Sequence, residues 1–473
     1  MALILLNNFG LGGIADSKYL GLANSNAALV GFDLHSEPGI LKVNQKLTND
    51  SGATVDDFVK AIVPCSDGNT YFFGATTGKI WKRTSGGVYS LEATATPAAG
   101  AAGILDAREY QGYIYYSMQS KLGRWQLSTA WSARNDSWAS FSNTDIDFHP
   151  MIEQGLVMYI GDRNYLAQVD GVTFSNGSTI LDIKNPLRMR SLGRVLTDIL
   201  VGTYVTDNVT ATEIFRWNTW SLSFTNSDEI PETGINAFLS TDNSVIVNAG
   251  RKGNLYSYNG MQLDQFKQIP GTWSGTNQAI VHANAVANLY GLPLFGLSNI
   301  SGNPAPQGVY SYGSRDRNYT KVLNLEYVIS TGNISNIEIG AMVISGDNMF
   351  VSWKDTNTGT VYGVDRLDAS NKYSGAYFET RVINIERSSQ KELNVVVNYR
   401  TLPTGTGINI YASVNYGSYT LLTSINDIDR LCKYAKERIS GANTVQIKVE
   451  LTASGNNAPE LESVEIEILP GEV

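Results

Sequence analysis

The chain has 473 residues, of which 42% are hydrophobic, 10% aromatic and only 17% charged, and it contains 45 glycines. Its 35 Lys and Arg against 44 Asp and Glu give a net charge of −9. A basic nucleic-acid binder is excluded because it needs clustered cations, and a coiled coil because it needs abundant charged helix formers. Disorder is excluded by the apolar content. The length predicts two to four domains or one large repetitive domain.

The chain opens on the apolar run Met1–Leu6, which Asn7 and Asn8 end. This run is too short for the hydrophobic region of a signal peptide, and no stretch approaches the about 18 apolar residues of a membrane span. Cys65 and Cys432 are the only two thiols, too few for a disulfide framework or a structural zinc site. We therefore expect a soluble protein with two buried free thiols, made in a reducing cytosol, without membrane insertion.

Strand-like sequence follows at 29–34 and 39–43, after the glycine-rich stretch 10–14. These strands precede a repeat and lie outside it. Because a ring of repeated sheets must be closed, a strand from one terminus often completes a sheet built by the other. We predict that residues 28–46 supply that closing strand or the edge of a blade.

Seven pairs of apolar, often aromatic strands follow, each pair separated by glycine or small polar residues. The pairs are 70–74 with 78–82, 112–116 with 122–125, 156–161 with 165–169, 198–202 with 213–217, 245–250 with 253–260, 289–292 with 308–312, and 348–353 with 359–363.

The second strands of the pairs recur at steps of 41 to 54 residues. One apolar residue in each marks the repeat: Ile80, Leu122, Leu166, Ile214, Leu255, Val309 and Val361. This period with paired strands is typical of a β-propeller with one four-stranded blade per repeat. We predict an all-β fold with a seven-bladed propeller, with six or eight blades and an array of sandwiches as alternatives.

From Tyr373 onward short strands without the repeat predict a C-terminal β-sandwich. Alternation is clear at Leu461, Val464, Ile466 and Ile468. The spacing of Ile428, Leu431, Cys432, Ala435 and Ile439 before Gly441 predicts one short helix. The domains expected are a leader with closure strands (1–60), the propeller blades (61–372) and the sandwich (373–473).

Catalytic and metal-binding patterns are weak. His35, His149 and His282 have no partner at metal-ligand spacing, and the Asp33–Glu37 segment resembles a polar turn more than a catalytic triad. The turn at 66–71 is only faintly similar to a sialidase turn, and Asp347, Asp355 and Asp365 do not form a calcium loop. We expect no catalytic, cofactor-binding or metal-binding residue, no cofactor, and no enzyme activity.

Aromatic residues are the remaining candidates for binding. Those at matching places in the repeat are expected to pack between blades: Trp125, Trp217, Trp220, Trp273, Tyr256 and Tyr258. Trp131 and Trp138 lie in the polar stretch 128–143 and are therefore the predicted partner contacts.

The segments 6–14, 31–41 and 253–260 resemble virion β-propeller proteins of tailed bacteriophages, and the likeness extends to the C-terminal stretch 459–464. The resemblance implies a tail hub or nozzle-like structural protein. Such a protein forms an oligomeric ring in the virion with other tail or neck proteins and extends the DNA channel. The net charge of −9 fits a wall along which DNA passes without specific binding. The alternative is a propeller that binds a glycan or host receptor on a virion or cell surface.

Overall fold

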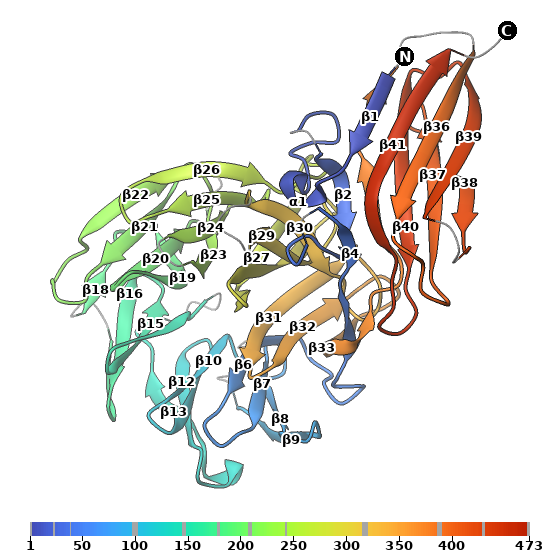
Figure 1. Ribbon diagram of the computed structural model, residues 1–473. Helices are drawn as coiled ribbons and strands as arrows, with labels where there is room; N and C mark the ends of the chain where they lie inside the picture. Colours follow the sequence, from blue (N-terminus) through green and yellow to red (C-terminus); the bar gives the residue numbers. More distant parts are fainter. Residues whose placement is uncertain are drawn as a thin grey trace.

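The computed structural model describes residues 2–21, 24–37, 39–96, 103–143, 148–176, 180–206, 211–241, 244–314, 320–385, 390–427 and 431–470. Seven four-stranded antiparallel units form a ring, and a β-sandwich stands beside it (Figure 1). The predicted all-β fold, a seven-bladed propeller followed by a C-terminal sandwich, is confirmed. Helical structure in the described residues is limited to α1 (Phe9–Gly12) and one 3₁₀ turn, Trp131–Ala133.

Each blade is an up-and-down meander, and the strands of the first four blades follow one another in the chain. They are β6 (Val59–Pro64), β7 (Thr70–Gly74), β8 (Lys79–Arg83) and β9 (Tyr89–Thr94) in blade 1; β10 (Asp106–Tyr110), β11 (Tyr113–Ser117), β12 (Lys121–Gln126) and β13 (Asn135–Ser140) in blade 2; β14 (Met151–Gln154), β15 (Val157–Asp162), β16 (Tyr165–Asp170) and β17 (Thr173–Ser175), with β18 (Leu181–Asp182) beside β16, in blade 3; and β19 (Arg188–Val195), β20 (Asp198–Tyr204), β21 (Thr212–Trp217) and β22 (Asn226–Ile230) in blade 4.

The last three blades continue the pattern, except that the outer strand of blade 7 comes from near the N-terminus. The strands are β23 (Ile235–Ser240), β24 (Val245–Ala249), β25 (Asn254–Tyr258) and β26 (Leu263–Gln268) in blade 5; β27 (Gln278–Leu289), β28 (Leu292–Ser301), β29 (Gly308–Gly313) and β30 (Val322–Tyr327) in blade 6; and β31 (Ile337–Ser345), β32 (Asn348–Asp355), β33 (Val361–Lys372) and β5 (Gln45–Asn49) in blade 7.

The sequence repeat corresponds to the second and third strands of each blade, and its apolar marker residues lie on the third. Six of the seven markers have no exposed surface, whereas Val361 is 50% exposed at the start of β33. In the sixth repeat the predicted first strand is wrong: Tyr290 and Gly291, both with positive φ, form the turn between β27 and β28. An Asn-Gly-like turn of two left-handed residues is what a tight hairpin requires.

The ring is closed by β5, which pairs antiparallel with β33 and places Leu47 opposite Leu367. The closing strand therefore lies at the end of, and beyond, the predicted segment 28–46. The remainder of that segment belongs to the junction and the sandwich. A second link joins blades 7 and 1, because the Ser352 hydroxyl donates to the Val59 carbonyl at 2.8 Å.

The propeller and the sandwich share one sheet. Strand β2 (Asn26–Val30) pairs in parallel with β30 of blade 6 and antiparallel with β34 (Ala376–Thr380) of the sandwich. The sheet continues through β40 (Thr444–Thr452), β37 (Gly407–Val414) and β38 (Thr420–Ile425), with β35 (Ile383–Asn384) also on β40. We call it the shared sheet. Backbone hydrogen bonds that run from a blade into the sandwich hold the two parts in a fixed relation.

The second sheet of the sandwich is centred on β41 (Glu460–Pro470). Its other strands are β36 (Gln390–Tyr399), β39 (Cys432–Ser440), β1 (Ala2–Leu6), β3 (Phe32–Asp33) and β4 (Leu41–Val43). The predicted alternation in β41 is confirmed, because Leu461, Val464, Ile466 and Ile468 are all buried. The first 60 residues therefore contribute strands to the sandwich, the shared sheet and blades 1 and 7.

The short helix predicted around 428–439 is wrong. Ile428 lies outside the described residues, and Cys432–Ser440 form β39, paired along its length with β36. Ala435 and Ile439 are buried on one face of this strand, whereas Leu431 is 61% exposed. Cys432 is exposed too, so the prediction of two buried thiols is wrong for Cys432 and confirmed for Cys65. A spacing of four places residues on the same side of a helix and of a strand alike, so pairing with β36 decides between them.

None of the helices in the described residues is long and apolar enough to cross a membrane.

Candidate functional site

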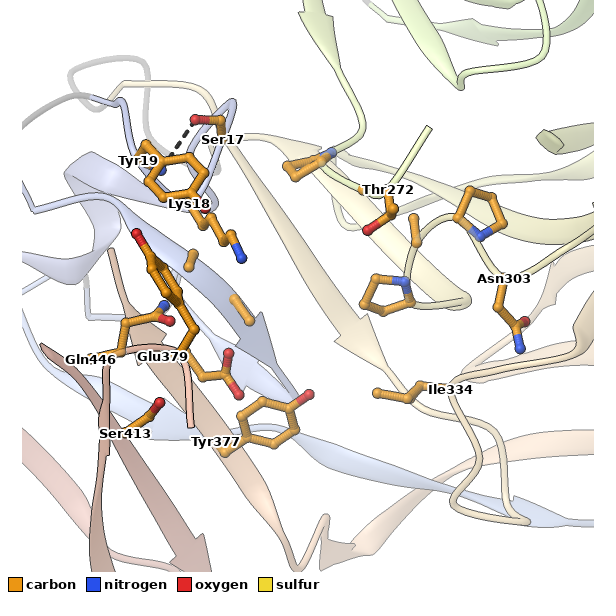
Figure 2. A pocket seen from close by; sticks show the side chains of 18 of the residues that line it. Ser17, Lys18, Tyr19, Thr272, Asn303, Ile334, Tyr377, Glu379, Ser413 and Gln446 are labelled. Atoms are coloured by element: carbon orange, nitrogen blue, oxygen red, sulfur yellow. Dashed lines mark hydrogen bonds between the residues drawn. The ribbon is translucent and has the colours of Figure 1, made fainter. Parts of the chain in front are cut away.

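A cleft of about 690 Å³ lies between the sandwich strands of the shared sheet and loops of the propeller. One wall comes from the sandwich, with Tyr377 and Glu379 on β34 and Gln446 on β40. The other comes from the propeller loops that follow β26, β28 and β30. Figure 2 shows the two walls facing one another, with Tyr377 and Glu379 opposite Thr272, Asn303 and Ile334. The volume of the cleft falls within the range of small-molecule binding sites.

The segment Asp16–Tyr19 forms the third side and is bonded to both parts of the molecule. The Asp16 carboxylate pairs with Lys267 of β26 at 2.6 Å, and the Lys18 carbonyl accepts from the backbone N–H of Val382 at 2.8 Å. The Ser17 hydroxyl accepts from the backbone of Tyr19 at 3.1 Å. Because this segment is tied to propeller and sandwich alike, the cleft is formed before any ligand arrives.

Two tyrosines and a lysine form the rim. Tyr19 and Tyr416 are about half exposed, and their ring centroids lie 6.4 Å apart. The Lys18 ammonium lies 5.3 Å from one ring centroid and 5.4 Å from the other. The lysine therefore orients both aromatic rings at the cleft mouth.

Tyr416 has a strained backbone, with φ at 61°, next to Asn415 at 52°. A bulky residue in the left-handed region is a conformational outlier. The turn is held by Asn415, whose side-chain oxygen accepts from the backbone N–H of Asn443 at 2.7 Å and whose amide donates to the Gly441 carbonyl at 3.1 Å. The exposed tyrosine at this rim is therefore held in a strained backbone conformation, which the hydrogen bonds of Asn415 stabilise.

Glu379 is the carboxylate of the sandwich wall. Burial raises its pKa, and the nearby Lys448, Tyr419 and Lys18 oppose that shift. Tyr377 lies two residues away on the same face of β34, and burial raises its phenol pKa in turn. Lys448 covers the Tyr377 ring at 4.2 Å. The wall therefore offers a carboxylate acceptor beside a phenol that stays protonated at neutral pH.

The propeller wall is built from proline-rich loops. Pro270, Pro304 and Pro306 line it, together with the side chains of Thr272 and Asn303. The Thr272 backbone N–H donates to the Pro304 carbonyl at 2.5 Å, which joins two of these loops. Rigid apolar ring surfaces thus alternate with polar groups opposite the tyrosines.

The predicted partner contacts lie elsewhere, in blade 2. Trp131 is only 7% exposed and stacks on Trp125 with centroids 3.9 Å apart, so the expectation that it is accessible is wrong. Trp138 is partly buried, with the Arg124 guanidinium 4.5 Å from its ring centroid and Tyr115 against its edge. The sequence around Trp131 and Trp138 is polar, so it gave no sign of their aromatic packing partners, which lie on other strands.

Among the aromatics expected to pack between blades, four are buried as predicted: Trp125, Trp217, Tyr256 and Tyr258. Trp273 is partly buried. Trp220 is the exception at 92% exposure. It lies in the long turn between β21 and β22, outside the paired strands of the fourth repeat, so the expectation that it packs between blades is wrong.

Trp220 belongs to a wider set of exposed apolar side chains that we call the turn-tip face. Its members occupy turns between the first and second or the third and fourth strands of a blade, and in a meander these turns lie at the same end. They are Val88, Leu156, Val172, Leu196, Trp220, Leu222, Met261 and Tyr290, each at least 64% exposed.

Hydrogen bonds between neighbouring blades confirm that these turns lie together on one face. The Tyr110 hydroxyl donates to the Leu156 carbonyl, and the Gln154 amide donates to the Thr197 carbonyl at 2.7 Å. The Arg216 guanidinium donates to the Gly260 carbonyl at 2.9 Å. The cleft is lined by loops from the opposite ends of the blades, so it lies on the other side of the ring.

His35 and His149 are buried in structural contacts, and His282 is partly buried. The Nε2 atom of His35 lies 3.2 Å from Glu326, and both ring nitrogens of His149 lie within 3.0 Å of backbone carbonyls. His282 lies on β27 with its ring 5.9 Å from that of Phe58. Burial lowers its pKa to about 4, with Lys60 and Arg190 nearby adding to the effect and Glu338 opposing it. The Glu338 carboxylate is 3.8 Å from its Nε2 and also pairs with Lys354.

The acidic residues considered for calcium are likewise separate. The Asp365 carboxylate accepts from the Ser330 hydroxyl and the Trp353 indole, each at 2.6 Å, and burial raises its pKa to about 6. Asp355 accepts from Asn333 at 2.6 Å. Within the described ranges, no three His, Cys, Asp or Glu side chains are grouped so that they could hold a metal ion.

No protein-family model matches the chain, and no curated protein sequence matches it. Among solved structures, the extracellular domain of the putative one component system BT4673 from B. thetaiotaomicron is 17% identical, with a TM-score of 0.46 over 80% of this chain and 45% of that one. The extracellular domain of the putative hybrid two component system BT3049 is 9% identical, with a TM-score of 0.47 over 85% and 55%.

A streptogramin B lyase structure is 13% identical, with a TM-score of 0.41 over 68% of this chain and 97% of that one. The chain spans less than half the length of the BT4673 structures that it matches. At these values the similarities give no ligand, partner or activity for this protein. They accompany a fold that its own sheet topology defines as a β-propeller.

Proposed function

We propose that this protein is a non-enzymatic structural component of a tailed-phage virion, which assembles into an oligomeric ring at the tail or neck. The observation that carries the proposal is the turn-tip face. Its exposed side chains include Trp220 at 92% and Leu222 at 93%, two residues apart in one turn. Apolar side chains concentrated at one end of the blades are typical of a surface that another protein covers.

The energetic argument concerns these side chains. Covering a Leu, Val or Met side chain is worth about 1.5–3 kcal/mol each, and tryptophan is enriched at the energetic centres of interfaces. Leu196 and Tyr290 also have positive φ, at 53° and 52°, so the fold accepts strain to place them at turn tips. A second copy of the chain is the proposed occupant, because oligomers of one chain close by symmetry into rings.

Two further features support a mechanical role. The shared sheet joins the propeller to the sandwich through β2, so a ring would be built from stiff units. The net charge of −9 on each copy would give an assembled ring an acidic surface, along which DNA passes without specific binding. Buried His35, His149 and Asp365 are each engaged in structural contacts, which supports a non-enzymatic role.

The experiment measures the mass of particles formed by the purified protein and by a Trp220→Ser, Leu222→Ser double variant. The proposal predicts a discrete oligomer that the double variant dissociates while its circular dichroism stays the same. Val361→Ser is the matched control, because Val361 is an exposed apolar residue at the opposite end of a blade. A wild-type protein that remains a monomer at about 100 µM would contradict the proposal, since assembly interfaces bind more tightly than this.

A further inference from the structure

We propose that the cleft between the propeller and the sandwich binds a neutral carbohydrate, with Tyr416 stacking on a sugar ring and Glu379 accepting hydrogen bonds from its hydroxyls. This activity is separate from the assembly role, since the cleft and the turn-tip face lie on opposite sides of the ring. The proposal rests on the shape, charge and composition of the cleft.

The charge of the lining selects against an anionic ligand. Three of the described residues lining the cleft are charged: Asp16, Lys18 and Glu379. Asp16 is paired with Lys267 at 2.6 Å, and Lys18 is placed over the rings of Tyr19 and Tyr416. A phosphate, a sulfate or a nucleic acid would meet a carboxylate and no clustered cations.

The polarity of the lining selects against a purely apolar ligand. Besides Glu379, the lining carries the hydroxyls of Ser17 and Thr272 and the amides of Asn303 and Gln446. The Ser17 hydroxyl, the Asn303 side-chain carbonyl and the Gln446 amide nitrogen each already form a hydrogen bond with the backbone. Their remaining donor and acceptor capacity would be left unpaired under an apolar molecule, which costs free energy. A sugar has hydroxyls on its edges that donate and accept, so it can satisfy such groups around its whole perimeter.

Flat apolar surfaces complete the match. Figure 2 shows Tyr19 and Tyr377 on the side of the cleft opposite Thr272, Asn303 and Ile334. Tyr416 and the propeller-loop prolines also line the cleft: Pro270, Pro304 and Pro306. A pyranose presents an apolar face of C–H groups and a polar edge of hydroxyls. A slot with aromatic and proline rings on its walls and polar groups between them suits both features of the sugar.

The strained tyrosine supplies an independent argument. Tyr416 is 56% exposed with φ at 61°, a conformation that Asn tolerates far better than Tyr. Stability alone would favour Asn or Gly there. A ligand that stacks on the Tyr416 ring would explain why a tyrosine occupies this strained position. A purely structural turn would not need a tyrosine there.

The test is saturation-transfer NMR of the full chain with glucose, galactose, mannose and N-acetylglucosamine, each at about 10 mM, which detects the millimolar binding expected of a single sugar. We expect transfer to at least one of them, strongest at the protons of one ring face. Tyr416→Asn should raise the dissociation constant of the sugar about fivefold or more, because an aromatic contact is lost. Glu379→Gln should raise the dissociation constant about tenfold, since the substitution replaces a charged hydrogen-bond acceptor by a neutral one.

Two readouts separate a binding role from a structural one. Tyr416→Asn should leave the thermal midpoint unchanged or raise it while binding falls. Tyr290→Asn is the matched control, because Tyr290 is an exposed tyrosine with φ at 52° on the opposite face, and it should not change sugar binding. Absence of transfer to all four sugars would overturn the proposal, as would binding that survives both cleft substitutions.

Discussion

The pH dependence of stability should be set in part by His282 of β27, whose pKa burial lowers to about 4 from a usual value of 6.5. The perturbation is His282→Gln, which keeps a polar side chain of similar length. The folded protein holds this imidazole neutral, whereas the unfolded chain takes up a proton below about pH 6.5. The contribution of His282 to stability is therefore present above pH 6.5 and is lost as the pH falls toward 4.

The magnitude follows from the fall of the His282 pKa from 6.5 to about 4, which corresponds to about 3 kcal/mol. For 473 residues the unfolding entropy is about 1 kcal/mol per kelvin, so this free energy corresponds to about 3 °C in the thermal midpoint. Asp365 acts in the opposite direction. Its folded pKa of about 6 lies above the usual 3.8, so its contribution is lost as the pH rises from 3.8 to 6.

The assay is differential scanning calorimetry of the wild type and His282→Gln between pH 4 and 7. We expect the wild-type midpoint to fall by about 3 °C relative to the variant as the pH drops from 7 to 4. Asp365→Asn should change the slope with the opposite sign, which makes it the companion measurement. Parallel midpoint curves for wild type and His282→Gln would refute the reasoning, because the imidazole would then titrate alike in the folded and unfolded states.

Three other substitutions or modifications test separate parts of the structure. Leu47→Ala, in the ring-closing strand, should cost about 2–5 kcal/mol in denaturant unfolding because Leu47 is only 3% exposed; a cost below about 0.5 kcal/mol would argue against closure by β5. Trp131→Ala should destabilise blade 2 by about 3–5 kcal/mol and leave sugar binding intact, whereas a loss of binding in a stable protein would restore the tryptophan hypothesis. A maleimide should modify the exposed Cys432 in the native protein and spare Cys65, whose thiol is buried with a raised pKa; equal labelling of both, read by mass spectrometry, would contradict this burial.

The propeller was predictable because each blade places its strands in the same buried surroundings between neighbouring blades. The third-strand residues Ile80, Leu122, Leu166, Ile214, Leu255 and Val309 are fully buried, and that burial requires an apolar residue at each turn of the repeat. The sixth repeat was less regular in sequence because β27 and β28 are long, with Tyr290 and Gly291 at their turn.

The closure and the helix were harder because both depend on distant pairing. Strand β5 meets β33 more than 300 residues later in the chain, and nothing local in Gln45–Asn49 identifies its partner. The Ala435 and Ile439 spacing fits a helix and a strand equally, and only β36 beside it resolves the choice.

The cleft could not be predicted from sequence, since the residues that line it come from eight separate stretches of the chain. Tyr377 and Glu379 read as alternating positions of an ordinary strand, and the Asn415–Tyr416–Gly417 turn reads as a common hairpin. The one available signal was a tyrosine where Asn or Gly is usual. The prediction for Trp131 and Trp138 failed for a related reason. Their neighbours in sequence are polar, but in the fold they pack against Trp125, Arg124 and Tyr115 from other strands.

The most direct test of the central claim is a cryo-electron micrograph of the purified assembly at a resolution that separates the copies. The account predicts a closed ring in which Trp220 and Leu222 of each copy are buried against a neighbouring copy. Single particles of one chain, with the turn-tip face open to solvent, would contradict it.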